Sequence, residues 1–250
     1  MNAQKRIIII GATSSIAEHC ARLWAKDEPA EFVLVARDNE KMNLIAKDLQ
    51  ARTQNTSVTC IESDFLNSEK IQSTVDSICI DQHLDIVLIA HGSLPNQKDC
   101  QASLDACKAS LEINALSPVY FAEAFAKHLE TAGKGALAII GSVAGDRGRK
   151  SNYVYGAAKG LVGRYAQGLQ HRFANTDVKV VLIKPGPTDT PMTAHLKQEG
   201  IKLAAVEVVA KQITQGISHG KRVIYAPGKW RLIMLVIQHI PNFLFRKMDI

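Results

Sequence analysis

Seven short runs of apolar and β-branched residues recur along the chain, and they limit its fold more than any other feature. Each run is apolar throughout instead of alternating with polar residues, which is typical of parallel strands buried on both faces of a sheet. The runs are 6–10, 31–36, 57–63, 84–90, 135–142, 178–186 and 221–227. The sequence therefore predicts a seven-stranded parallel sheet.

Longer stretches with apolar residues at helical spacing separate these runs. The clearest are Ser15–Lys26, Asn39–Gln54, Ala109–Glu130 and Tyr153–Phe173. Strands that alternate with helices predict a doubly wound α/β fold, with helices on both faces and ligand sites at the carboxyl ends of the strands. One long stretch, 188–205, fits neither pattern, and we predict a mobile lid there.

A length of 250 residues is enough for one large core but not for two ordinary domains with a linker, so we expect a single domain over 1–250. The sequence contains no run of about twenty uncharged apolar residues, and its N-terminus lacks a signal-peptide pattern. The five cysteines include no C-x-x-C pair, which favours reduced thiols. These features predict a cytoplasmic protein.

The net charge of +6 comes from one end of the chain. Residues 221–250 contain six basic residues and one acidic residue, a net charge of +5, which leaves +1 for the other 220 residues. We find no pattern of interleaved basic and aromatic residues of the kind that binds nucleic acid. The sequence therefore predicts no nucleic-acid partner.

The first strand runs into a helix through the loop Gly11-Ala-Thr-Ser-Ser-Ile-Ala17. In a dinucleotide-binding loop, one glycine makes the tight turn, a second admits phosphate and a third allows close packing. Gly11 supplies the first, and Ala17 is small enough for the third role. Ser14 and Ser15 offer hydroxyls at a helix N-terminus that favours anions. The loop predicts a pyrophosphate site, or an ordinary N-cap.

Tyr155 and Lys159 lie four residues apart on a predicted helix, so their side chains are neighbours on one face. A nearby ammonium group favours the phenolate and lowers the pKa of tyrosine from about 10. The pair therefore predicts an acid–base group. Tyr153 has Ala157 at the same offset, and we expect it to pack or to face the substrate.

Two further polar residues complete a candidate catalytic set. Ser142 follows the fifth apolar run, where its hydroxyl can bond a carbonyl oxygen. Asn114 lies inside a helical pattern, which is unfavourable unless its amide bonds backbone or water. Each alone fits a surface serine or a helix-kinking asparagine. Their joint occurrence with Tyr155 and Lys159 favours catalysis.

In this order, the motifs resemble those of the short-chain dehydrogenase/reductase family over residues 5–228. The resemblance rests on the Gly11 loop, Asp64 in "ESDFLN", "IAHG", Asn114, Ser142, Tyr155-x-x-x-Lys159 and "KPGPTDTPM". Two departures mark a divergent branch. The glycine loop contains Ser15 and Ala17, and the usual N-A-G appears as Ala90-His91-Gly92.

The resemblance implies a Rossmann-like fold and nicotinamide-dependent reduction of a carbonyl group. Tyr155 would protonate the substrate oxygen, and Lys159 would lower its pKa and bind the nicotinamide ribose. Ser142 would polarise the carbonyl group, and Asn114 would hold a water that relays protons. The implied cofactor contacts are Gly11, Thr13, Ser14, Ser15, Ile16, Arg37, Asp64, Phe65, Ala90, His91, Gly92, Tyr155, Lys159, Pro185, Gly186, Thr188 and Thr190.

The end of the second strand bears on cofactor choice, because an acid there bonds a ribose hydroxyl and an arginine accepts a 2′-phosphate. Ala36 occupies the position expected for an acid, and Arg37 follows it. This favours NADP(H). If the strand ends one residue later, Asp38 is the ribose ligand and NAD(H) is the alternative.

Two other residues have alternative interpretations. The resemblance places Asp64 against adenine, but it also fits the N-cap of a helix beginning in "LNSEK". His91 beside Gly92 either contacts the cofactor or packs as a structural histidine. No metal-binding pattern accompanies His91, so we predict no metal site.

The C-terminal segment, residues 229–250, is basic and apolar but too short and interrupted to span a bilayer. It predicts either peripheral contact with the inner face of the membrane or a helix that closes the pocket or packs in an oligomer. With "GATSSIA", it loosely resembles the branch of the family that contains decaprenylphospho-β-D-erythro-pentofuranosid-2-ulose 2-reductases. That resemblance implies a lipid-linked keto-sugar substrate.

Three functions remain open at this stage. The first is a reductase of lipid-linked or bulky apolar ketones, and the second is a soluble reductase of acyl or steroid-like ketones. The third is a non-catalytic NADP(H) sensor or scaffold. The resemblance also implies a homodimer or homotetramer built partly on the helices at 109–130 and 153–173.

Overall fold

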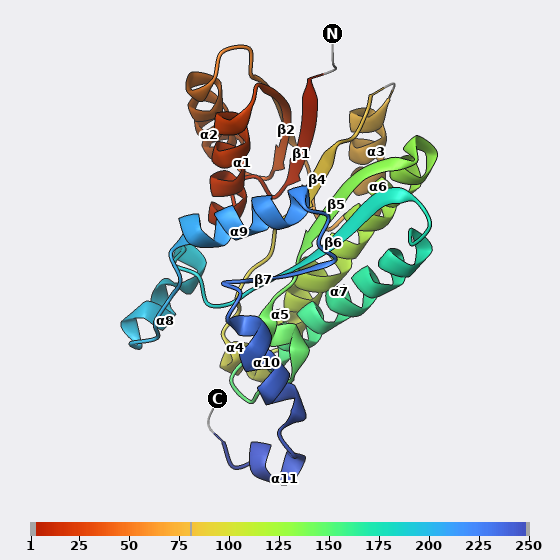
Figure 1. The fold of residues 1–250 in the computed structure, drawn as a ribbon. Coiled ribbons are helices and arrows are strands. Elements are labelled where there is room, and N and C mark those ends of the chain that lie inside the picture. The colour runs from red at the N-terminus through yellow and green to blue at the C-terminus, as the bar shows by residue number, and fades with distance from the viewer. Residues whose placement is uncertain (1–3, 81, 249–250) are drawn as a thin grey trace.

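The computed structural model describes residues 4–80 and 82–248, and its strands form one seven-stranded parallel sheet (Figure 1). The strand order is β3-β2-β1-β4-β5-β6-β7, which confirms the doubly wound prediction. The strands are β1 (Lys5–Ile10), β2 (Ala30–Ala36), β3 (Ser57–Glu62), β4 (Ile86–Ile89), β5 (Lys134–Ile140), β6 (Asp177–Pro185) and β7 (Val223–Ala226).

Helices cover both faces of the sheet in Figure 1. The longer ones are α1 (Ser15–Asp27), α2 (Asn39–Arg52), α3 (Ser68–Cys79), α6 (Ser117–Ala132), α7 (Tyr153–Arg172) and α9 (Val206–Ser218). The shorter ones are α4 (Gln97–Ala102), α5 (Leu104–Leu111), α8 (Ala194–Gln198), α10 (Trp230–His239) and α11 (Asn242–Phe245). Short 3₁₀ turns span Val143–Asp146 and Pro191–Thr193.

The isoleucines of β1 explain why its sequence is apolar throughout. Ile7 and Ile9 face a core formed with α1, α2 and α9, whereas Ile8 and Ile10 face a second core formed with α3, α6 and α7. All four side chains are fully buried. Because both faces of the strand are covered, no position on it favours a polar residue.

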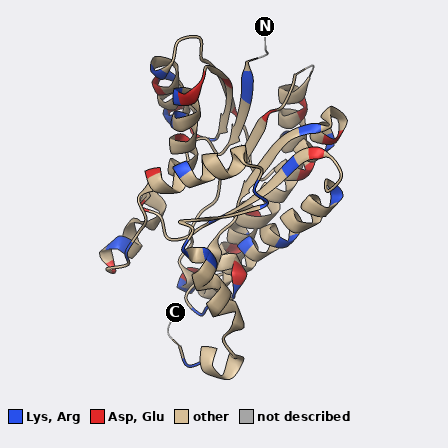
Figure 2. Ribbon diagram, in the orientation of Figure 1, with Lys and Arg blue, Asp and Glu red and all other residues tan. Residues whose placement is uncertain are grey.

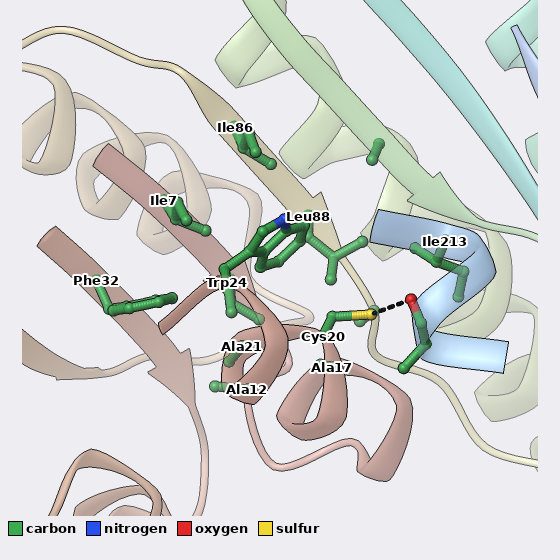
Figure 3. Packing of buried hydrophobic residues seen from close by; sticks show 14 of the residues in the cluster. Ile7, Ala12, Ala17, Cys20, Ala21, Trp24, Phe32, Ile86, Leu88 and Ile213 are labelled. Atoms are coloured by element: carbon green, nitrogen blue, oxygen red, sulfur yellow. Dashed lines mark hydrogen bonds between the residues drawn. The ribbon is translucent and has the colours of Figure 1, made fainter. Parts of the chain in front are cut away.

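Helix α1 packs tightly against the sheet (Figure 3). Trp24 and Cys20 lie among the buried side chains of this core, and the Cys20 thiol donates to the Ala210 carbonyl of α9 at 3.9 Å. Burial raises the pKa of this thiol. All five cysteines are free thiols, as the sequence predicted.

The helical prediction for Ala109–Glu130 is confirmed, but the stretch is not one regular α-helix. The chain instead forms α5, a π-helical turn over Glu112–Leu116, and α6. The Ser117 backbone N–H donates to the Glu112 carbonyl, five residues back. Pro118 has no N–H, so it cannot bond the Asn114 carbonyl in the usual α-helical way. The π turn therefore lies at the residue whose amide the sequence singled out.

The segment 188–205 contains the Pro191–Thr193 turn and α8, which the sequence pattern did not predict. Its ends are joined by a parallel bridge between Thr188 and Ala204. Its mobility stays a prediction. Within residues 4–80 and 82–248, no helix has both the length and the apolar character needed to cross a membrane.

Candidate active site

The loop after β1 lies where β1 and β4 are neighbours, the point at which the strand order reverses. Gly11 has a φ of +82°, and a Cβ atom there would lie 2.6 Å from the backbone nitrogen of His91. Only glycine tolerates both this conformation and this approach. The first glycine is therefore required by contact between the ends of two strands.

The rest of the loop accounts for the two missing glycines. Ala17 is fully buried in the α1 core, where a small side chain allows helix and sheet to approach. Ser14 is the N-cap residue of α1, but its hydroxyl makes no capping hydrogen bond. The Ser14 hydroxyl is therefore not committed to capping, and Ser15 and Ile16 follow in the first turn of α1.

Helix α2 supplies a cation that the sequence analysis missed. The Lys41 ammonium donates to the Thr13 carbonyl at 3.0 Å, across twenty-eight residues. Lys41 and Arg37 are both exposed. Apart from its position shortly after the second strand, no sequence signal distinguishes Lys41 from any other helical lysine.

Strand β2 ends at Ala36, so the condition for Asp38 as a ribose ligand is not met. Asp38 is instead the N-cap of α2, and its carboxylate accepts from the Lys41 backbone N–H at 2.9 Å. Arg37 makes no side-chain hydrogen bond or ion pair among the residues that the structure describes. The arginine, not the aspartate, is free to bind a ligand here.

The alternative reading of Asp64 as a helix cap is wrong. Asn67 is the N-cap of α3, and it accepts from the Lys70 backbone N–H. Asp64 accepts from the Leu66 backbone N–H at 2.8 Å in a tight turn after β3. The next residue, Phe65, is buried and packs edge-on against the ring of His91, with 4.7 Å between ring centroids.

His91 is held between Phe65 and Phe121, and its Nε2 atom lies 2.8 Å from the Ser117 hydroxyl oxygen. Its Nδ1 atom is buried and has no partner among the described residues. Burial, together with the charges of Lys159 and Arg37, lowers the pKa of His91 to about 3. His91 is thus a neutral, largely structural ring with one unpaired nitrogen.

Asn114 is completely buried in the π turn, and its role is to hold the chain after β4. Its Oδ1 atom accepts from the Ser93 backbone N–H at 2.9 Å, and its Nδ2 atom donates to the Ser93 hydroxyl at 3.4 Å. A Cβ atom on Gly92 would lie 2.7 Å from the Asn114 Oδ1 atom and 3.5 Å from the Lys159 Nζ atom. The three residues are therefore close neighbours.

Lys159 is buried, and its ammonium donates to the Ile140 carbonyl at the end of β5 at 3.1 Å. Its nitrogen lies 5.8 Å from the centre of the Tyr155 ring. Burial lowers the pKa of Lys159 to about 8. The lysine therefore loses its proton far more readily than an exposed one.

The expectation that Lys159 draws the pKa of Tyr155 downward is wrong for this arrangement. Burial raises the pKa of Tyr155, and a hydrogen bond with Ser142 opposes that rise. The charge of Lys159 is directed at a carbonyl oxygen instead of the phenol. Tyr155 is consequently protonated at neutral pH.

Ser142 is the N-cap of the Val143–Asp146 turn, and its hydroxyl accepts from the Ala144 backbone N–H at 3.1 Å. This turn packs directly on α7 through glycines that the sequence analysis did not notice. A Cβ atom on Gly145 would lie 2.7 Å from the Lys159 carbonyl carbon, and one on Gly156 would lie 2.9 Å from the Ala144 oxygen. Small residues thus bring Ser142 close to Tyr155.

The "PGPT" stretch after β6 is the last of the predicted segments at the carboxyl edge of the sheet. The Gly186 backbone N–H donates to the Ala226 carbonyl at 2.9 Å, and the Thr188 hydroxyl donates to the Gly186 carbonyl at 2.8 Å. Pro185 ends β6, and Thr190 lies in the next turn. The structure therefore brings the predicted residues after β1, β4, β5 and β6 to one edge of the sheet.

A sequence model described as short chain dehydrogenase matches residues 5–200 of this chain. The chain belongs to the short-chain dehydrogenase family. It is an NAD(P)-dependent oxidoreductase of this family. The buried Asn114 and Lys159 and the half-buried Tyr155 are thus elements of a dehydrogenase fold, and their order along the chain is the one the motifs predicted.

Relatives of this dehydrogenase extend along its whole length. An uncharacterized oxidoreductase of Streptomyces coelicolor is 26% identical over 245 residues, which cover 98% of this chain and 96% of the relative. A short-chain dehydrogenase from Sphingobium yanoikuyae, solved in complex with NADPH, superposes with a TM-score of 0.81 at 21% identity, covering 98% of this chain and 96% of that one.

A second solved structure is the bulky-bulky ketone specific alcohol dehydrogenase from Comamonas testosteroni. Its TM-score is 0.79 at 22% identity, with coverage of 100% of this chain and 96% of that one. At these identities the two solved structures establish the fold. Among the described residues, no group of three or more His, Cys, Asp or Glu side chains could hold a metal ion in this dehydrogenase.

The C-terminal segment of the dehydrogenase begins against the site. A Cβ atom on Gly186 would overlap the indole of Trp230, at 1.9 Å from its nitrogen, so glycine is required where α10 meets the end of β6. Arg147, next to the Ser142 turn, donates to the Ile237 and Ile240 carbonyls at 2.5 and 2.7 Å. Its guanidinium also stacks on the Phe245 ring, 3.8 Å from the centroid.

Beyond these anchors the segment is largely exposed. Met234 is the one residue of α10 that is buried. Apolar side chains on the outer surface include Leu232, Leu235, Val236, Phe243 and Leu244, which are 48–68% exposed. In Figure 2 the ribbon of α11 carries no charged residue, whereas Lys229 and Arg231 precede this apolar stretch and Arg246 and Lys247 follow it.

Proposed function

We propose that this dehydrogenase is an NADP(H)-dependent carbonyl reductase that converts a ketone to an alcohol. The observation that carries the proposal is the pair formed by half-buried Tyr155 and buried Lys159 beside Ser142, at the carboxyl edge of the sheet. A phenol with a raised pKa is a proton donor at neutral pH, which is the role that reduction of a carbonyl requires.

In this proposal Tyr155 donates its proton to the carbonyl oxygen of the substrate, and the Ser142 hydroxyl donates a hydrogen bond to the same oxygen. Lys159 binds the nicotinamide ribose. Asn114 fixes the chain after β4 and holds a water that relays protons to Lys159. The nicotinamide cofactor, when bound, supplies the hydride.

The residues that follow the carboxyl ends of the strands fit a dinucleotide. Ser14 leaves its hydroxyl uncommitted at a helix N-terminus, and the Nδ1 atom of His91 is buried without a partner. We propose that the loop from Gly11 to Ile16 binds the pyrophosphate. Asp64, Phe65 and His91 then line the adenosine side, and Pro185 to Thr190 line the nicotinamide side.

Preference for NADP(H) is supported by two exposed cations, Arg37 and Lys41. We propose that both bind the 2′-phosphate, because a guanidinium is suited to phosphate and Lys41 lies beside the same loop. The carboxylate that would favour NAD(H), Asp38, caps α2. The neighbour from Sphingobium yanoikuyae was solved with NADPH, which agrees with this preference.

The exposed C-terminal segment supports a bulky apolar or lipid-linked keto substrate, with a keto sugar as the specific candidate. Its apolar surface is flanked by basic residues at both ends, as in segments that lie in a headgroup layer. We propose peripheral contact with the inner face of the membrane. Leu235, Val236 and Ile240 line a shallow apolar hollow on this surface.

The second candidate function is a soluble reductase of bulky ketones. It is favoured by the contact of Trp230 with Gly186, which places the start of α10 against the site as a wall. The Comamonas testosteroni neighbour is described as specific for bulky-bulky ketones. In this reading the segment closes a pocket and has no lipid partner.

We further propose a cytoplasmic, single-domain protein that assembles as a homodimer or homotetramer. Support for assembly comes from exposed apolar residues on the two helices named by the sequence, including Tyr120 on α6 and Leu161 on α7. Light scattering would test the assembly. A fully monomeric protein at micromolar concentration would contradict it.

The first experiment titrates the protein with NADPH and NADH and follows nicotinamide fluorescence. We expect tighter binding of NADPH, and a loss of that preference in both Arg37→Ala and Lys41→Ala. Lys47→Ala, an exposed lysine further along α2, is the matched control. Preference for NADH, or no binding, would reopen the sensor and scaffold interpretation.

The second experiment separates the two substrates by removing residues 230–250 and measuring turnover and vesicle binding. We expect loss of turnover with lipid-linked ketones and loss of binding to anionic vesicles. If both are unchanged, the lipid-linked proposal is wrong and the soluble reductase is retained.

A further inference from the structure

The Val143–Asp146 turn, which Ser142 caps, ends in a carboxylate that is almost completely buried. The Asp146 side chain is only 3% exposed, and both of its oxygens accept hydrogen bonds. The Lys184 ammonium donates to Oδ1 at 2.5 Å, and the Tyr225 hydroxyl donates to Oδ2 at 2.9 Å. Because burial removes the water around a carboxylate, such partners must replace it. The position of Asp146 is therefore set by two other segments of the chain.

Those two partners come from the strands at the end of which the "PGPT" stretch lies. Lys184 is the last but one residue of β6, and Tyr225 is opposite to it on β7. The Lys184 ammonium also donates to the Tyr225 hydroxyl at 3.4 Å. One residue further along β7, the Ala226 carbonyl accepts from the Gly186 N–H. Asp146 consequently ties the turn after β5 to the ends of β6 and β7 (Figure 1).

On its other side the turn rests on α7. A Cβ atom on Gly145 would lie 2.8 Å from the Gly160 backbone nitrogen, so the two backbones are in direct contact. The Gly145 N–H donates to the Ser142 carbonyl at 3.1 Å, which closes the turn, and the Ser142 hydroxyl bonds Tyr155. In so short a turn, a displacement at Asp146 is passed directly to Ser142.

Stability alone does not account for a buried ion pair at this place. The cost of removing two charges from water is about as large as their attraction, so apolar side chains of similar volume would hold the strands equally well. Charge-assisted hydrogen bonds to both oxygens, in contrast, fix the direction of the carboxylate. The arrangement of Asp146, Lys184 and Tyr225 therefore favours a role in geometry.

We infer that Asp146 is a positioning residue for the proposed reduction. Through Lys184 and Tyr225 it aligns the Ser142 turn, which binds the carbonyl oxygen, with the "PGPT" stretch, which lines the nicotinamide side. Hydride and proton reach the two atoms of one carbonyl group, so both sides must be aligned together. A misplacement of about 1 Å can lower a rate on the order of 100-fold. The inference rests on the proposed function and adds the group that aligns its parts.

The test measures the rate of reduction within the bound complex. Parent and variants are loaded with one equivalent of NADPH and mixed with excess cyclohexanone or benzophenone, and the loss of nicotinamide fluorescence is followed over a single turnover. Asp146→Ala removes both hydrogen bonds and should lower the rate constant about 10- to 100-fold. In steady state, kcat should fall while KM for the ketone and the affinity for NADPH stay within about twofold, because Asp146 contacts neither ligand in this assignment.

The single turnover separates alignment from folding. Partial unfolding lowers the amplitude of NADPH oxidation but leaves its rate constant unchanged, whereas misalignment lowers the rate constant. Asp146→Asn keeps an oxygen for Lys184 and an N–H for the Tyr225 oxygen, so it should restore most of the rate. Tyr225→Phe should cause a smaller fall, and no further fall in Asp146→Ala, because its effect passes through the carboxylate.

Asp48→Ala is the matched control. Its carboxylate on α2 also accepts from two side chains, those of Arg22 and Arg52, but it lies outside the site. We expect no change in the rate constant. Thermal unfolding shows whether each variant is folded. If Asp146→Ala does not fold, Tyr225→Phe provides the test, because it leaves the ion pair with Lys184 in place.

The possible failures are distinct. A parental rate constant in Asp146→Ala, or in Tyr225→Phe if only that variant folds, overturns the inference and leaves the proposed reductase in place. An equal loss in Asp48→Ala overturns it as well. If the parent enzyme reduces neither ketone, the proposed function is overturned, and the inference with it.

Discussion

The catalytic edge and the C-terminal segment touch each other but are built in opposite ways. At the edge, Asn114 and Lys159 are buried and each is held by hydrogen bonds to backbone groups. In the segment, apolar side chains such as Leu232 and Phe243 are exposed, and Arg147 is the main tether. The comparison teaches that burial and backbone hydrogen bonds hold the residues at the carboxyl edge of the sheet, whereas the C-terminal segment leaves most of its apolar side chains exposed.

The largest expected effect falls on the catalytic edge alone. Tyr155→Phe should lower the reduction rate by about 10³-fold, because proton transfer by a positioned side chain contributes on the order of 10²–10⁴. NADPH affinity and vesicle binding should not change. Steady-state kinetics measure the reduction rate, and nicotinamide fluorescence measures the affinity for NADPH. Retained activity would refute the assignment of Tyr155 as the proton donor.

A second effect tests how rigid the edge is. Gly11→Ala should destabilise the fold by about 2–4 kcal/mol, since the added methyl group meets the His91 backbone at a positive φ. Chemical denaturation measures the change. Gly148→Ala is the control, because a Cβ atom there meets nothing within 4 Å. Equal stability of the two variants would show that the backbone around Gly11 and His91 can shift to accommodate the methyl group.

The segment should respond differently to loss of its tether. Arg147→Ala should speed proteolysis within 229–248 about tenfold, while NADPH affinity stays the same, because a charge-assisted hydrogen bond contributes roughly 1.5–3 kcal/mol. Arg147→Lys should give an intermediate rate, since lysine keeps the charge but lacks the planar fork. Unchanged proteolysis in both variants would mean that Trp230 alone holds the segment.

The smallest effect concerns pH. The pKa of Lys159 is about 8 in the folded protein and near its ordinary value of 10.5 when unfolded. The ammonium is therefore lost as pH rises through about 8, and the kcat/KM for NADPH should fall there. In Lys159→Met, the kcat/KM that remains should no longer fall at this pH. In the same variant, the rise in unfolding free energy between about pH 8 and 10.5 should also disappear, because it comes from the lowered pKa.

Much of the site was predictable because its residues follow strands in a fixed order. Asn114, Ser142, Tyr155 and Lys159 were each identified from local patterns, and the structure brings them to one edge. Arg37 was distinguished from Asp38 only by the place where β2 ends. Lys41 was missed because its contact with the loop after β1 arises from the fold, and no pattern in the neighbouring residues indicates that contact.

The sequence by itself determined the seven strands, most of the helices and the order of the motifs. Strands and helices bury apolar residues at regular spacing, and that spacing can be recognised from neighbouring residues. Tertiary structure alone decided the contact of Gly11 with His91, the raised pKa of Tyr155 and the π turn at Asn114. It also decided that Arg147 would hold a helix end some ninety residues away. These depend on which segments the sheet brings together, and on how deeply each group is removed from water.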